Sequence, residues 1–303
     1  MVQPKVSVVI TCYNYGQYVE AALQSVLSQT FQDFEIILIN DGSTDDSEEK
    51  IHPFLSDPRL KYIKQNNSGQ AKAKNRGINE SSGEFIAFLD ADDKWEKTKL
   101  EKQLPLFFDK NMGVIYSKTK YIDENNNPVN LVLKDKYLQP RKGRVTNFLY
   151  MNNFVPFSSS IVRCTCFDKF GLFDESLSMG IDWDLWLRVS THYNFDFVDD
   201  YLLIYRIGHS GQMSKKTEIR HKCSDRIMEQ FKKKYPAFVS AKSHRNALSY
   251  TYFNRSKYYS HKDPWKGICF SLKATRLAPG ELKGYYAFLL CCRGFLFCKK
   301  SLS

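Results

Sequence analysis

A short apolar run that ends in carboxylates constrains this chain more than any other stretch. Residues 85–89 are too few for a typical helix and are rich in strand-forming side chains. Their continuous apolar character is typical of a strand buried on both faces, as in a parallel sheet covered by helices. Asp90, Asp92 and Asp93 follow immediately. We therefore expect a buried strand with an acidic carboxyl end.

Carboxylates this close together repel one another unless a cation or solvent compensates their charge. At the carboxyl end of a buried strand, they occupy the edge where open α/β sheets bind ligands. An oxygen-ligated divalent cation that itself holds a phosphate would explain the arrangement. A solvated acidic turn that merely ends a strand is the alternative. This stretch alone leaves both interpretations open.

The first 90 residues alternate between strand-like and helix-like patterns. Strands are expected at 6–10, 34–40, 60–64 and 84–89, with helical segments between them. This βαβαβαβ order predicts an α/β fold with a mostly parallel sheet flanked by helices and connected right-handedly. The sequence contains neither GxGxxG nor GxxxxGK[ST], which excludes a Rossmann dinucleotide fingerprint and a P-loop.

Polar side chains follow three of these strands. They are Thr11 and Tyr13, Asp41 and Ser43, and Asp90 and Asp92. Because the carboxyl ends of parallel strands meet at one edge of a sheet, these residues are expected to converge there. The convergence of three polar strand ends indicates a ligand site more specifically than any single strand end does.

The remaining chain is less regular. The patterns predict a helix over 97–110, strands at 114–117, 158–162, 195–198 and 201–206, a hairpin or excursion over 120–134, and a loop over 208–214. Another helix is expected to begin near Asp182, where the positive end of the helix dipole stabilises a carboxylate.

The charge of the chain is unevenly distributed. The net charge is +11, but residues from Arg206 onward hold 21 Lys and Arg against 5 Asp and Glu, while residues 1–205 hold 23 against 28. An acidic N-terminal part and a basic C-terminal part imply two different roles. We expect a first domain over 1–214 and a basic helical extension over 215–303.

No pattern typical of secretion, membrane spanning or zinc binding is evident. The chain starts without a charged leader and apolar core, and the apolar tract at 285–298 is too short for a bilayer and is broken by Arg293 and Gly294. Its eight cysteines lack zinc-like paired spacing. Buried free thiols in a reducing cytoplasm are the favoured interpretation.

The basic extension allows three interpretations: solvated helix faces, contact with anionic lipid or a lipid-diphosphate acceptor, or nucleic-acid binding. Lys232–Lys234 together with the apolar 285–297 segment favours a peripheral location on the inner face of the cell membrane. A nucleic-acid partner is not expected, because the sequence contains no recognised nucleic-acid-binding module and the acidic N-terminal part would repel phosphate.

The motifs in their order and spacing resemble glycosyltransferase family 2, the GT-A group of inverting sugar transferases. Residues 5–93 and 170–214 carry the resemblance, which extends over roughly the first two-thirds of the chain. The matching stretches are Val6–Asn14, Asn40–Thr44, Gly69–Asn75, Phe88–Asp93 and Gly180–Trp186. It implies a GT-A-like sheet whose first half is a Rossmann-like nucleotide-binding unit.

The resemblance also implies a nucleotide-sugar site. Thr11, Tyr13 and Asp41 would line the base and ribose pocket, and Asp90–Ala91–Asp92 looks like the family's DxD motif. Asp90 would face the ribose, while Asp92 would bind Mg²⁺ or Mn²⁺ that bridges the diphosphate. The remaining expected nucleotide-sugar or metal contacts are Asn14, Ser43, Lys74 and, as a further candidate metal ligand, His209.

Asp182 is similar to the family's general base, and Asp184 and Trp186 would be structural or face the acceptor. Three positions depart from the family pattern: Asn40 where Asp is frequent, Lys74 where Arg is frequent, and Ile181 where Glu often precedes the base. Lys74 keeps a phosphate contact but loses bidentate geometry.

The implied activity is a metal-dependent, hexosyltransferase-type transfer from a UDP- or dTDP-linked sugar to an acceptor hydroxyl. The acceptor would be a glycan or lipid-linked glycan, in bacterial surface polysaccharide or lipid-linked precursor synthesis. A non-catalytic sugar-nucleotide or polyanion-binding protein is the alternative.

Overall fold

The structure is a computed structural model that describes residues 3–131 and 135–300, in two compact units. The first unit contains the chain up to Thr146 and Phe154–Phe231, and the second contains Asn147–Asn153 and the chain from Lys232 onward. The compact units therefore separate at 231/232, within a helix. The functional division expected at 214/215 stays a prediction.

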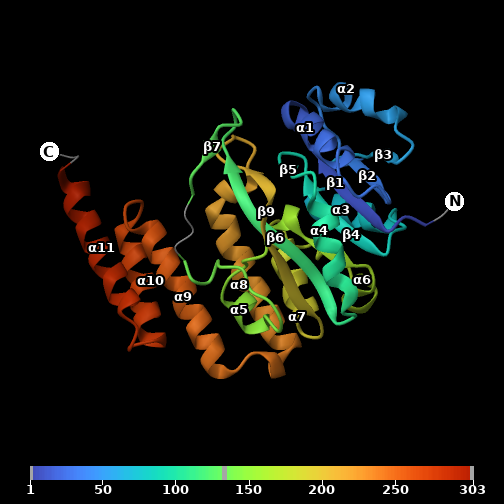
Figure 1. Ribbon diagram of the computed structural model, residues 1–303. Coiled ribbons are helices and arrows are strands. Elements are labelled where there is room, and N and C mark those ends of the chain that lie inside the picture. Colours follow the sequence, from blue (N-terminus) through green and yellow to red (C-terminus); the bar gives the residue numbers. More distant parts are fainter. Residues whose placement is uncertain (1–2, 132–134, 301–303) are drawn as a thin grey trace. The chain divides into compact units, whose positions relative to one another are not determined.

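One mixed sheet forms the centre of the first unit (Figure 1). Its order is β3-β2-β1-β4-β8-β6-β9-β5, and β7 pairs with β6. The strands are β1 Val6–Cys12, β2 Phe34–Asn40, β3 Leu60–Lys64, β4 Phe85–Asp90, β5 Lys94–Trp95, β6 Met112–Ile122, β7 Pro128–Val129, β8 Ile161–Arg163 and β9 Asn194–Arg206.

The first four strands are parallel, which confirms the expected α/β class. Beyond β4 the short strand β8 runs antiparallel to both β4 and β6, and β6 pairs in parallel with β9. The register of β1 and β4 places Thr11 directly opposite Asp90. Two of the expected site residues thus lie side by side because of strand pairing alone.

Helices cover both faces of the parallel half. Val19, Leu23 and Val26 of α1 lie in one core cluster with Val8 of β1. Val9 points to the opposite face, where it packs against Gly77 of α3 so closely that a Cβ on Gly77 would lie 2.4 Å from a Val9 methyl group. The central strands are therefore buried on both sides, as their apolar composition predicts.

The first unit also contains helices and single 3-10 turns. The helices associated with it are α1 Gly16–Leu27, α2 Ser47–Ile51, α3 Gln70–Asn79, α4 Lys99–Gln103, α6 Thr165–Phe170 and α7 Ile181–Ser190, while α5 Thr146–Met151 and α8 Thr217–Lys234 cross the division between the units. Single 3-10 turns occupy His52–Ser56, Leu104–Phe108, Phe157–Ser159 and Met213–Lys215.

Several expected boundaries need correction. The helix predicted over 97–110 is α4 followed by a 3-10 turn, because Pro105 lacks the amide hydrogen that an α-helix interior requires. The strands expected at 195–198 and 201–206 form one strand, β9, whose register with β6 slips between Val198 and Tyr201. Strand β8 starts only at Ile161, after a 3-10 turn.

The middle segment is a hairpin as far as it is described. Strand β6 extends well beyond the expected 114–117, and its end pairs with β7 through Tyr121 and Val129. Positions 132–134 of the predicted excursion lie outside the described residues.

The second unit consists mainly of three helices that pack against one another, α9 Ala241–Tyr259, α10 Pro264–Leu277 and α11 Leu282–Lys300 (Figure 1). A 3-10 turn at Pro236–Phe238 precedes them. Ser240 and Asp263 cap α9 and α10 through hydrogen bonds to backbone amides three residues on. Within the described part of the chain, no helix combines the length and apolar character needed to cross a membrane.

One charged side chain is fully buried in the first unit without a polar partner. The Nζ of Lys99 has no hydrogen-bond partner among the described residues and lies 4.0 Å from the centre of the Trp95 ring. Burial lowers the pKa of Lys99 well below its usual value. The contact with the ring offsets only part of the desolvation cost.

We predict that Lys99→Met stabilises the protein by about 1 to 3 kcal/mol near neutral pH. The unfolded chain binds more protons between the lowered pKa and the ordinary value of about 10.4, so stability rises with pH across this window. The increase in the free energy of unfolding that Lys99→Met produces should therefore shrink as the pH approaches the ordinary lysine pKa.

Urea denaturation at a series of pH values measures this effect, with Lys97→Met as the control because Lys97 is exposed. The control should change the free energy of unfolding by less than about 0.5 kcal/mol. Equal gains from both variants, or a gain that does not vary with pH, would contradict the account.

Candidate active site

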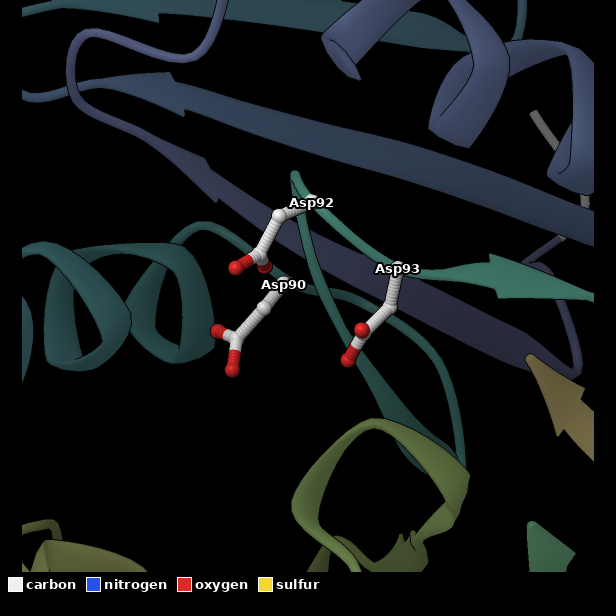
Figure 2. A group of neighbouring side chains, drawn as sticks. All are labelled: Asp90, Asp92 and Asp93. Carbon is white, nitrogen blue, oxygen red and sulfur yellow. The ribbon is translucent and has the colours of Figure 1, made fainter. Parts of the chain in front are cut away.

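Three carboxyl groups meet in the turn between β4 and β5 (Figure 2). One oxygen from each of Asp90, Asp92 and Asp93 lies within 4.8 Å of the others. Ala91 is buried between them, which fixes the turn to the sheet. The side chains of all three acids leave the turn on the same side (Figure 2). Their negative charges are therefore concentrated in one small volume.

Asp93 supports this turn from beneath. Its carboxylate accepts a hydrogen bond from the Ser158 hydroxyl at 2.5 Å and another from the Arg206 backbone amide at 3.0 Å. The side chain is buried, and burial together with the charges of Asp92 and Asp90 raises the pKa of Asp93 well above its usual value. The sequence left Asp93 without a role, and the structure makes it an anchor of the turn.

Arg206 is the principal residue that sequence reasoning missed. Its guanidinium donates to the Asp92 backbone oxygen at 3.0 Å, to the Asp123 and Glu124 backbone oxygens, and to the Asn126 side chain. It also lies 4.4 Å from the Tyr18 ring centre and is almost fully buried. Arg206 is the last residue of β9. The expectation that polar side chains at strand ends belong to a site, used above for the first strands, would have identified it.

Lys74 neutralises part of the acidic cluster. Its Nζ donates to the Asp90 carboxylate at 2.8 Å and to the Thr11 hydroxyl at 3.3 Å, so residues from α3, β4 and β1 meet. Burial, followed by the charge of Asp92, raises the pKa of Asp90, while Lys74 opposes this rise. One ammonium group does not compensate three carboxylates.

His209 reaches the cluster from the loop after β9. Its Nε2 lies 2.9 Å from a carboxylate oxygen of Asp92. The imidazole is buried and makes edge contacts with the rings of Tyr15 and Tyr18, at 5.7 and 5.4 Å between ring centres. The Tyr15 hydroxyl donates to the Gly211 backbone oxygen and ties the loop to α1. The structure thus brings His209 to Asp92, and its role as a metal ligand stays a prediction.

The loops after β1 and β2 are hydrogen-bonded to each other. Asn14 has a left-handed φ of 57°, and its side-chain oxygen accepts from the Thr44 amide at 2.8 Å. The Asn14 amide in turn donates to the Ser43 hydroxyl at 3.0 Å. Tyr13 remains 46% exposed beside this junction. The ring is open on the surface, as a nucleobase-stacking residue would need to be.

Asp41 organises the loop that precedes α3. Its carboxylate accepts from the backbone amides of Ser68 and Gly69 at 2.9 and 3.0 Å and from the Gln65 side chain at 2.7 Å. The residue is nearly fully buried. These bonds give Asp41 a structural role, and its contact with a nucleotide stays a prediction.

Asp182 is half-buried in the first turn of α7, two residues after the N-cap residue Gly180, which has a left-handed φ of 72°. The segment before Gly180 is attached to α3. Asn75 exchanges hydrogen bonds with the Phe173 backbone, and Gln70 donates to the Ser178 backbone oxygen. Helix α3 therefore holds Lys74 at Asp90 and also fixes the segment that leads to Asp182.

The other residues of the α7 motif are structural. Asp184 forms an ion pair with Arg188 at 2.8 Å, and Arg188 donates to the backbone oxygens of Phe170, Gly171 and Leu172. Trp183 and Trp186 are buried. Asp184 and Trp186 thus stabilise the surroundings of Asp182.

The donor atoms of the cluster fit Mg²⁺ or Mn²⁺. Carboxylate oxygens are the ligands that these hard cations prefer. Burial, and after it the negative charge of the neighbouring carboxyl groups, raises the pKa values of Asp90 and Asp93, and a divalent cation would favour their charged forms. Both oxygens of Asp93 already accept hydrogen bonds, so Asp92 and Asp90 are the residues that would hold the ion.

Comparison with known proteins agrees with this geometry. The model of the family described as Glycosyl transferase family 2 matches residues 7–170, which include all four parallel strands and the acidic turn. The chain belongs to glycosyl transferase family 2. This membership confirms the resemblance identified in the motifs of the sequence.

Several glycosyltransferases are similar in sequence to part of this chain. An uncharacterized glycosyltransferase of Rickettsia felis is 30% identical over 215 residues, 70% of this chain and 36% of that protein. One of Methanocaldococcus jannaschii is 30% identical over 213 residues, 68% of this chain and 72% of that protein. The chain spans about a third of the length of the first Rickettsia relatives that it matches.

Solved structures share the fold at low sequence identity. S. aureus TarS 1-349 has a TM-score of 0.65 and 19% identity, covering 96% of this chain and 89% of that one. The mannosyltransferase PcManGT from Pyrobaculum calidifontis has a TM-score of 0.59 and 13% identity, covering 100% and 88%. These similarities confirm the GT-A-like architecture.

We predict that Arg206→Lys lowers the free energy of unfolding by about 3 kcal/mol, because an ammonium group cannot satisfy the acceptors that the guanidinium now joins. Urea denaturation measures the change. Arg220→Lys, at an exposed position on α8, is the control and should be near neutral. Similar stability of the two variants would show that Arg206 does not support the turn.

Proposed function

We propose that this chain is an inverting, metal-dependent glycosyltransferase that moves a sugar from a nucleotide-diphosphate sugar to an acceptor hydroxyl. The observation that carries the proposal is the acidic turn, in which Asp90 and Asp92 lie beside Thr11 and Lys74 at the carboxyl ends of parallel strands. Open α/β sheets bind ligands at this edge. Membership of the family supports the proposal.

On the donor side, the exposed ring of Tyr13 is available to stack on the base. Thr11, Asn14, Ser43 and the loop ordered by Asp41 surround the same strand ends. Lys74 provides a cation for the phosphate region, and Asp90 and Ala91 complete the turn. We favour a UDP- or dTDP-linked hexose. Among the structural neighbours, TarS 1-349 has been solved with UDP-GlcNAc and PcManGT with GDP-Man and Mn²⁺.

The transfer is a direct displacement at the anomeric carbon of the sugar. Asp182 takes the proton of the acceptor hydroxyl as that oxygen attacks, so the chain forms no covalent intermediate. Lys74 stabilises negative charge on the departing diphosphate, and the buried turn keeps Asp92 in position. A divalent cation held by Asp92 and Asp90 would supply further stabilisation of the leaving group.

The acceptor is proposed to be a glycan or lipid-linked glycan, in bacterial surface polysaccharide or lipid-linked precursor synthesis. A non-catalytic sugar-nucleotide-binding protein is the alternative. Slow release of nucleoside diphosphate from donor without acceptor distinguishes the two, because only an enzyme accelerates this hydrolysis. A panel of sugar nucleotides with Mn²⁺, tested for thermal stabilisation of the chain, would identify the donor.

We predict that Asp182→Asn retains donor binding and lowers turnover by roughly 10²- to 10⁴-fold, because the amide cannot accept the proton. Donor affinity is measured by calorimetry and turnover by release of nucleoside diphosphate. Asp168→Asn, at an exposed carboxylate on α6, is the control and should leave both quantities unchanged. Near-normal turnover of Asp182→Asn would refute the assignment of the base.

We predict that Asp92→Asn loses the Mn²⁺-dependent part of nucleoside-diphosphate binding while the protein stays folded. The asparagine keeps the shape of the side chain and removes the charge that would bind the cation. Calorimetric titration with and without Mn²⁺ measures the difference. Equal enhancement by Mn²⁺ in the wild type and the variant would exclude Asp92 as a metal ligand.

A further inference from the structure

Helix α11 has an unusual distribution of side-chain size. Its inward positions are the small residues Gly284, Ala287, Cys291 and Gly294, all of them buried. A Cβ on Gly294 would lie 2.0 Å from the Ser260 backbone oxygen, so the helix approaches the end of α9 as closely as its backbone allows. Large side chains cannot occupy this inner face.

The large apolar side chains of α11 face outward instead. Leu282 is 81% exposed and Leu289 is 61% exposed, and Tyr285 and Tyr286 lie at the same helical spacing and are about half exposed. A helix that packs only against protein in water places such residues inside and polar ones outside. The outward face of α11 is therefore built for an apolar or interfacial environment.

Helix α10 repeats this arrangement. Its buried positions are Pro264, Gly267, Ser271 and Ala274. Trp265, 70% exposed, and Leu272, also exposed, are separated by two helical turns and lie on its outer side. Trp and Tyr are the side chains that favour the boundary between hydrocarbon and water, because their rings are apolar and carry one polar group.

The charge of the second unit complements an anionic surface. From Lys232 to the end, the sequence contains 15 Lys and Arg against only Asp263 and Glu281. Asp263 is occupied as the cap of α10. Several lysines lie over aromatic rings, such as Lys273 over Phe270 and Lys266 over Tyr259, so apolar and cationic groups are interleaved. This combination is typical of helices that lie in a membrane interface.

We propose that α10 and α11 dock the chain onto an anionic phospholipid bilayer, with their outward aromatic and leucine side chains in the interface and the surrounding lysines on the lipid head groups. The docked helices lie along the surface, since no described helix is able to span the bilayer. This surface is independent of the acidic turn, and its test requires no donor or acceptor.

The test is flotation of the full chain with vesicles of phosphatidylglycerol and phosphatidylcholine, compared with phosphatidylcholine alone. Binding is expected with the anionic vesicles and is expected to weaken with salt. Tyr286→Ser and Leu289→Ser should each weaken binding about tenfold, by the apolar area they remove from the interface. Lys273→Gln should weaken it about fivefold.

The matched control is Phe108→Ser, which removes a 96% exposed aromatic ring from the first unit and should leave binding unchanged. Circular dichroism and thermal denaturation verify that each variant is folded. Trp95, Trp183 and Trp186 are buried in the first unit, so quenching of fluorescence by brominated lipid reports on Trp265 and should disappear in Trp265→Phe.

Three results would overturn the proposal. The first is absence of binding to anionic vesicles by the wild type. The second is binding that Tyr286→Ser and Leu289→Ser leave intact. The third is a wild type that does not float but forms oligomers that Leu289→Ser dissociates, which would make the face a protein interface.

Discussion

The repulsion among Asp90, Asp92 and Asp93 is the constraint on which the first unit depends. Three carboxylates in one turn are tolerated only where cations and hydrogen-bond donors compensate them. Here Lys74 comes from α3, Ser158 from the turn before β8 and Arg206 from the end of β9. These donors are far apart in the sequence, so the acidic turn takes its shape only once the whole sheet has assembled. The site therefore depends on contacts between distant parts of the unit.

The features that could be predicted from the sequence are those with a local pattern. Thr11, Asp41 and Asp90 each follow a buried apolar run, and parallel strands bring their ends to one edge. In the structure Thr11 pairs with Asp90 across the sheet, and Lys74 donates hydrogen bonds to both side chains. The same pattern makes the α/β class and the family recognisable in the sequence.

The remaining roles arise from contacts that no local pattern contains. Arg206 gains its importance from backbone oxygens more than 80 residues away. Asn75 is a structural link because it meets Phe173 across 98 residues. Asp41 accepts hydrogen bonds from the amides of the loop before α3, a structural role that its position after a strand does not reveal. Such partners are brought together by the tertiary structure and do not follow from residue spacing.

The two units differ in which apolar side chains they bury. In the first, large apolar side chains fill both faces of the sheet and leave polar groups at the strand ends. In α10 and α11, small residues fill the helix contacts and large apolar side chains face outward. One unit thus gathers polar groups at its strand ends, and the other exposes large apolar side chains on its outer helix faces. A strongly basic composition accompanies only the second.

The central claim is that the turn after β4 holds a cation and a nucleotide diphosphate together. Anomalous diffraction from crystals soaked with Mn²⁺ and UDP tests it most directly. The account predicts a manganese peak bonded to the Asp92 carboxylate and to the diphosphate, with the base against Tyr13. Nucleotide bound elsewhere on the chain, or bound at these strand ends without manganese at Asp92, would contradict it.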